Sequence, residues 1–67
     1  MPTKVITLHQ DLRDHKVFDA IREGDIVMDA EGIRDEVTAV DKHMRSREMH
    51  YYISRRKYKT LLFILPL

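Results

Sequence analysis

From Gly24 onward, apolar residues recur at alternate positions in several short segments, and this spacing constrains the fold more than any other feature. A period of two is typical of strands with one buried face. We expect a compact apolar strand at 25–28 and half-buried strands at 33–40 and 49–54. A last strand is expected at 58–65, and a first strand or ordered arm falls within residues 1–10, at 5–8. The pattern predicts a mainly β protein.

The connections between these strands are expected to differ in kind. Asp29 to Gly32 forms a turn in which Gly32 can adopt a positive φ without steric cost. Asp35 interrupts the inner face of the next strand, close enough to that turn to remain near solvent. Residues 42–48 are polar apart from Met44 and indicate a mobile charged loop. Ser54–Lys57 contains no glycine, which favours a four-residue loop built on a type I turn.

The C-terminal strand is apolar on both faces near its end, and we expect Pro66 to end its ladder because proline has no N–H to donate. We expect Leu62 and Ile64 to point into the core. The opposite face would then be available to a second subunit, so the sequence predicts a homodimer at micromolar concentration. The residues of that self-association face are Leu61, Phe63 and Leu65.

Before Gly24, the apolar spacing fits one helical face imperfectly. Asp11 is the expected N-cap and Gly24 lies just past the end, which predicts about two turns of helix over roughly 14–22. The alternative is an extended loop pinned by Phe18 and Ile21. The predicted core comprises Phe18, Ile21, Ile26, Met28, Val37, Ala39, Tyr51, Ile53, Leu62 and Ile64.

One segment resembles a known fold family. The run from Phe18 to Val27, with its Gly-Asp-x-Val entry, is followed by Gly32 and then by Val37–Val40. This succession is similar to the opening of SH3-like small β-barrels, and the resemblance covers residues 18–40. With the strand pattern, it implies a twisted, mostly antiparallel sheet of four or five strands, partly closed into a barrel. The short helix or helical turn expected ahead of Gly24 departs from the minimal barrel of that family. Members of that fold bind RNA, DNA, peptides or proteins, so the resemblance implies a binding module.

Size and composition limit the possible chemistry. The 67 residues form one small domain, 1–67, and chains this short bury only about 60% of their unfolded surface. The absence of cysteine and of a signal-peptide pattern favours the cytoplasm, and the apolar tail is too short to span a membrane. The histidines, serines and paired carboxylates form no metal or nucleophile motif. We therefore expect no enzyme activity, no cofactor and no bound metal.

Charge is distributed unevenly along the chain. Residues 1–40 hold five Lys and Arg against nine Asp and Glu, a net of −4, whereas residues 41–67 hold seven against two, a net of +5. The asymmetry indicates either nucleic-acid or acidic-partner binding, or two halves that fold against each other. A basic surface with stacking rings would comprise Arg45, Arg47, His50, Tyr52, Arg55, Arg56, Lys57 and Lys59.

Two functions follow from these patterns. The first is a small regulator or inhibitor of the kind phages and bacteria encode, which binds another protein or a second copy of itself. The alternative is a small nucleic-acid-binding module that uses the basic face of residues 42–59.

Overall fold

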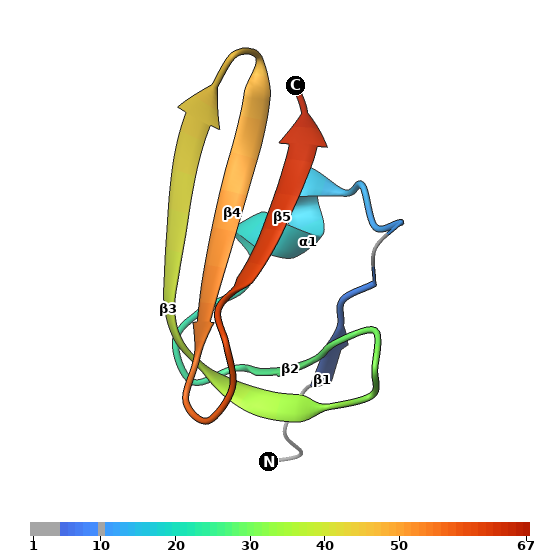
Figure 1. Ribbon diagram of the computed structural model, residues 1–67, viewed down its shortest axis with the longest axis vertical. Helices are drawn as coiled ribbons and strands as arrows, with labels where there is room; N and C mark the ends of the chain where they lie inside the picture. Colours follow the sequence, from blue (N-terminus) through green and yellow to red (C-terminus); the bar gives the residue numbers. More distant parts are fainter. Residues whose placement is uncertain (1–4, 10) are drawn as a thin grey trace.

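The computed structural model describes residues 5–9 and 11–67. A five-stranded mixed sheet in the order β1-β2-β3-β4-β5 dominates the fold, and one short helix, α1, covers part of it (Figure 1). All neighbouring strands pair antiparallel except β1 and β2, which are parallel. The expected mainly β fold is confirmed, but the sheet is not closed into a barrel. The elements are β1 (Val5–Thr7), α1 (His15–Asp19), β2 (Ile26–Met28), β3 (Arg34–Arg45), β4 (Glu48–Arg55) and β5 (Leu61–Pro66).

The N-terminal segment contains the expected strand and the expected helix, both shorter than predicted. β1 begins at Val5, and the rest of the possible arm, 1–4 and 10, lies outside the described residues. The helix is capped by Asp14, not by Asp11, and the Asp14 side chain accepts a hydrogen bond from the Lys16 N–H (3.0 Å). It ends at Asp19 because residues 20–25 form turns that lead into Gly24, whose φ is 94°. The extended-loop alternative is therefore wrong.

β3 and β4 form a long hairpin, and β5 runs beside β4 almost to the tip of this hairpin (Figure 1). The prediction of a mobile loop at 42–48 is wrong, since β3 continues to Arg45 and β4 begins at Glu48. Ser46 and Arg47 close the hairpin with φ values of 48° and 64°. Positive φ at both central residues is the geometry of a type I′ turn, which matches the twist of the flanking strands. Residues 41–48 are all exposed, so the hairpin tip is held by backbone pairing and has no buried face.

The core lies between α1 and the inner face of the sheet. Phe18 from the helix stacks on Tyr51 of β4 and makes a tilted ring contact with Phe63 of β5, with ring centroids 4.9 Å apart in both pairs. The predicted core positions Phe18, Ile21, Val37, Tyr51 and Ile53 are confirmed. The buried apolar residues are Ile6, Leu8, Phe18, Ile21, Val27, Val37, Tyr51, Ile53 and Leu65.

Five predicted core positions are wrong, each because the strand presents its other face or shifts register. In β2, Val27 is buried and its neighbours Ile26 and Met28 are only partly covered. A β-bulge between Val37 and Ala39 changes the register of β3, so Ala39 is only half-buried. In β5, Phe63 lies opposite the core residue Tyr51, which places its neighbours Leu62 and Ile64 on the outer face.

Candidate interaction surface

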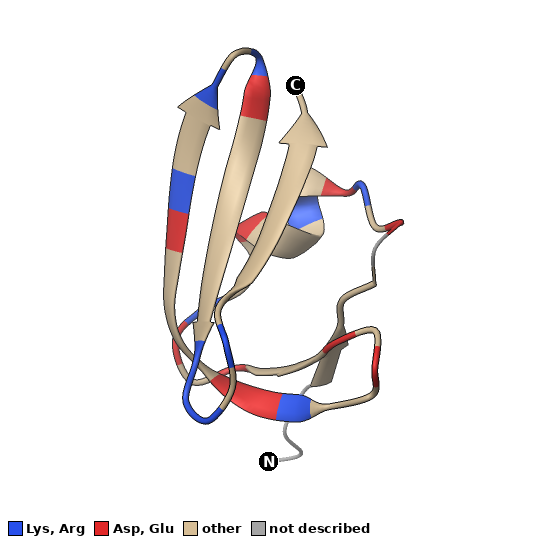
Figure 2. Cartoon of the chain, viewed as in Figure 1, with Lys and Arg blue, Asp and Glu red and all other residues tan. Residues whose placement is uncertain are grey.

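Six of the eight residues predicted to form one basic surface are divided between the two ends of β4, and the other two, His50 and Tyr52, lie within the strand. Arg45 and Arg47 lie at the hairpin tip, whereas Arg55, Arg56, Lys57 and Lys59 lie in or beside the loop between β4 and β5 (Figure 2). β4 spans eight residues. At ~3.3 Å per residue its ends are roughly 23 Å apart, more than twice a Debye length of about 10 Å at 0.1 M salt. The structure therefore has two small basic clusters, one at each end of β4, instead of one continuous basic surface.

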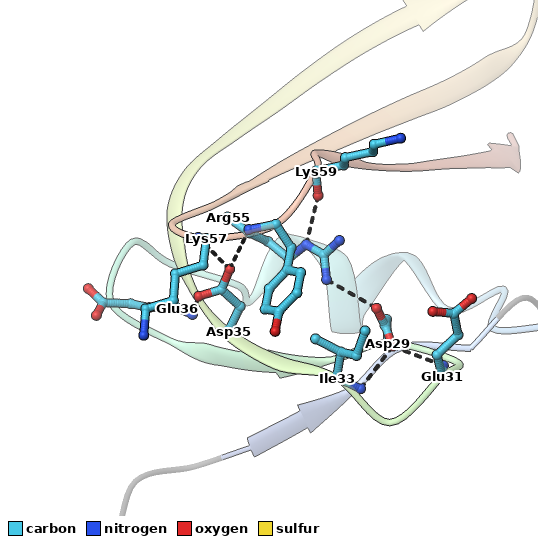
Figure 3. Close-up of polar contacts among 9 residues, drawn as sticks. Asp29, Glu31, Ile33, Asp35, Glu36, Arg55, Lys57 and Lys59 are labelled. Carbon is cyan, nitrogen blue, oxygen red and sulfur yellow. Dashed lines mark hydrogen bonds and ion pairs between the residues drawn. The ribbon is translucent and has the colours of Figure 1, made fainter.

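Arg55, a residue of the predicted basic surface, does not stand in water. Its side chain is 6% exposed, and its Nη1 lies 3.1 Å from Asp29 Oδ2 while its Nε donates to the Lys59 carbonyl (2.7 Å; Figure 3). Asp29 also accepts hydrogen bonds from the backbone N–H of Glu31 (2.9 Å) and Ile33 (3.0 Å). The Ile33 N–H is the main cause of the lowered pKa of Asp29, and the Arg55 guanidinium adds to it. Arg55 thus joins the β2–β3 turn to the start of β5.

Asp35 is buried, contrary to the expectation that it lies near solvent. Its side chain accepts hydrogen bonds from the backbone N–H of Lys57 (2.7 Å), Tyr58 (3.0 Å) and Glu36 (2.8 Å; Figure 3). Burial raises the pKa of this carboxyl, but the N–H groups of Lys57, Glu36 and Tyr58 together outweigh burial, so the pKa is lowered. The carboxylate therefore fixes the loop between β4 and β5. Arg56 lies beside Glu36, with 3.6 Å between Nη1 and Oε1, so a second cation of the loop has an acidic neighbour.

A polar cluster between α1 and the sheet was not predicted from the sequence. Tyr51 Oη lies 3.0 Å from His15 Nδ1 and 3.3 Å from Asp19 Oδ1, and Lys42 Nζ donates to the same Asp19 oxygen at 2.6 Å. His15 Nε2 is 2.9 Å from the Pro66 carbonyl oxygen. The Lys42 hydrogen bond is the main cause of the lowered pKa of Asp19, while burial raises the pKa of Tyr51. These contacts hold α1 against β3, β4 and the end of β5, and no local motif reveals them because the residues are far apart in sequence.

The outer face of β4 and β5 carries the predicted ring Tyr52, together with apolar side chains. Tyr52 is half-buried and pairs with Leu62, while His50 pairs with Ile64. Leu62 is 49% exposed and Ile64 41% exposed. The predicted self-association residues lie on the inner face instead. Leu65 is fully buried, and Leu61 and Phe63 pack against the core, so any association through side chains of β5 would use Leu62 and Ile64.

β5 is also the last strand of the sheet, and among residues 5–9 and 11–67 no strand pairs with its outer edge, which is open. Leu67 donates its backbone N–H to the Arg47 carbonyl (3.0 Å), toward the β4 side. Because backbone groups of a strand point alternately to its two sides, Leu65 and Phe63 also face β4. The N–H and C=O groups of Leu62 and Ile64 consequently point to the open side. Residues 60–67 contain no charged side chain that could protect this edge.

A groove of about 340 Å³ runs beside the open edge. One wall is β5 at 61–63, and the other consists of Leu8, which follows β1, and the β2–β3 turn at 29–31. Arg55 also lines it. β5 thus faces Leu8 and the β2–β3 turn across this groove.

Comparisons with protein-family models, with curated proteins and with solved structures found no match to this chain. Within the part of the chain that the structure describes, no helix is long and apolar enough to cross a membrane. Among the same residues, no group of three or more His, Asp or Glu side chains is placed to hold a metal ion.

Proposed function

We propose that this protein is a small, non-catalytic protein-interaction module that acts in the cytoplasm as a regulator of the phage or bacterial type. Its binding surface is the open side of β5, which comprises the free backbone edge and the exposed side chains of Leu62 and Ile64. The observation that carries the proposal is an edge strand whose outward backbone groups and apolar side chains are both uncovered.

Such an edge is unusual in a protein that remains unbound. Natural sheets protect their edges with charged residues, bulges or short strands, because an exposed apolar edge pairs readily with other chains. β5 has six residues and no charge within them, and its one proline, Pro66, lies at the end of the strand. Addition of a partner strand to an exposed edge is a common mode of recognition, in which backbone hydrogen bonds supply affinity and side-chain pockets supply specificity. The open edge of β5 suits this mode.

The carboxylates whose pKa values are perturbed support a non-catalytic role. Asp29 and Asp35 each bind backbone N–H groups that fix a loop, and Asp19 binds Lys42 and Tyr51. Perturbed pKa values cluster at active sites, but structural hydrogen-bond networks perturb them as well. Each of these three groups has such a structural partner.

Nucleic-acid binding is the second candidate, and the exposed cations at the two ends of β4 favour it. Its best test is the salt dependence of binding to single-stranded RNA. Replacing Lys57 and Lys59 with Ser should reduce the salt slope by roughly 0.7 for each phosphate that is no longer neutralised. Arg55→Ser is excluded from this test because that side chain is structural. Absence of salt-dependent binding in low-salt buffer would eliminate this candidate.

The proposed function is tested by selecting peptides from a random displayed library against the immobilised protein. The selected peptides are then mapped by the amide chemical shifts they perturb. We expect the largest shifts in β5, together with loss of binding in Leu62→Lys and normal binding in Thr38→Lys, an exposed position on β3. Both variants must retain the wild-type circular dichroism. Selected peptides that perturb another surface, or that bind Leu62→Lys unchanged, would refute the proposal.

A further inference from the structure

The groove between β5 and the β2–β3 turn has the features of a site for one particular kind of ligand. We propose that it receives an extended peptide segment of a partner protein, which pairs with β5 and places a Lys or Arg side chain beside Glu31. This inference rests on the proposed function and specifies its partner.

The two walls of the groove suit an extended chain. The outward N–H and C=O of Leu62 supply a donor and an acceptor on the β5 wall, as strand pairing requires. The opposite wall presents Leu8 and Ala30, and the β5 wall includes Leu61 and Phe63, which pack against the core. The side chains of a strand alternate between its two faces. A peptide paired with Leu62 would therefore direct every second side chain toward this apolar lining.

The charge of the groove specifies the polar part of the ligand. Asp29 and Arg55 neutralise each other at 3.1 Å. Glu31 is exposed, and within the described residues its carboxylate has no cationic partner. Figure 3 shows this carboxylate on the far side of Asp29 from the Arg55 guanidinium. One uncompensated negative charge thus remains on the wall facing Leu62, and a cation on the incoming strand would complement it.

The same observation argues against a second copy as the occupant of the groove. Residues 60–67 contain no Lys or Arg, so pairing of β5 with β5 of another molecule would leave Glu31 facing apolar side chains. Desolvating a carboxylate without a partner opposes binding. A basic peptide strand both pairs with the edge and neutralises this charge.

The test uses capped seven-residue peptides of alternating valine and threonine with one central lysine, glutamine or glutamate. Binding to the whole protein is measured by titration of the β5 amide shifts. We expect the lysine peptide to bind about three- to fivefold more tightly than the glutamine peptide, the ratio typical of a partly exposed ion pair. The glutamate peptide should bind most weakly. Glu31→Lys should reverse this order, whereas Glu23→Lys, an exposed acid outside the groove, should preserve it.

Two outcomes would overturn the inference. One is failure of the lysine peptide to bind at millimolar concentration. The other is binding at β5 with no dependence on the central residue or on Glu31. In either case the proposed function stands if the library-selected peptides still map to β5 and lose binding in Leu62→Lys, and it falls if they map elsewhere or bind that variant unchanged.

Discussion

Two leucines of β5 provide the sharpest test of the fold, because they have the same chemistry and opposite orientations. Leu65 is 0% exposed, whereas Leu62 is 49% exposed. Replacing a fully buried leucine with alanine typically destabilises a protein by about 2–5 kcal/mol, the sum of the forfeited transfer energy and the remaining cavity. Leu62→Ala removes about half of that transfer energy and leaves no enclosed cavity, so about 1 kcal/mol or less is expected.

Total stability sets the scale of the effect. A chain of 67 residues has a free energy of unfolding of roughly 3–10 kcal/mol at typical values per residue. With a urea m-value of about 1 kcal/mol per molar, Leu65→Ala should lower the unfolding midpoint by roughly 2–5 M or unfold the protein outright. Leu62→Ala should lower the midpoint by about 1 M at most. Equal losses, or a larger loss in Leu62→Ala, would show that β5 has the opposite register.

Three further predictions follow from individual features. The carboxylates of Asp19, Asp29 and Asp35 have pKa values below the ordinary 3.8. The stability that they contribute is therefore complete well above pH 3.8 and is lost as the pH falls through the lowered pKa values. A urea midpoint that stays constant from neutral pH to below about 3 would contradict this. Gly32 has a φ of 82°, and a Cβ added there would meet open space. Gly32→Ala should therefore lower the free energy of unfolding by about 1 kcal/mol through backbone strain alone. An unchanged urea midpoint would argue against that conformation. The outer face of β5 should support weak self-association, seen by sedimentation in the upper micromolar range and abolished by Ile64→Lys; a wild-type monomer at several hundred micromolar would disprove it.

Sequence patterns predicted the strand positions well where one face is polar. The alternation of Tyr51 and Ile53 with polar neighbours specifies which side is buried, and both residues are in the core. The same logic could not orient β5, because residues 61–65 are apolar on both faces and a shift of one residue exchanges them. Only pairing with β4, which places Phe63 opposite Tyr51, determines the orientation.

The two ends of the hairpin were mispredicted for a different reason. Residues 42–48 are polar apart from Met44 and lie at the exposed end of the hairpin, and a strand without a buried face lacks the alternation that identifies strands. At the other end, Arg55 and Asp35 looked like surface charges in sequence. Their partners, Asp29 and the backbone of Lys57 and Tyr58, are more than 20 residues away, as the sequence separations of 26, 22 and 23 show. Local composition contains no information about such contacts.

Amide hydrogen exchange along β5 measures the central claim, an open edge ready to accept a strand, most directly. In dilute free protein, the N–H groups of Leu61, Phe63 and Leu65 should exchange slowly, and those of Leu62 and Ile64 should exchange rapidly. Addition of the lysine peptide should slow exchange at Leu62, which faces the groove. Slow exchange at both Leu62 and Ile64 in the dilute free protein would show that the edge is already covered, and it would contradict the account.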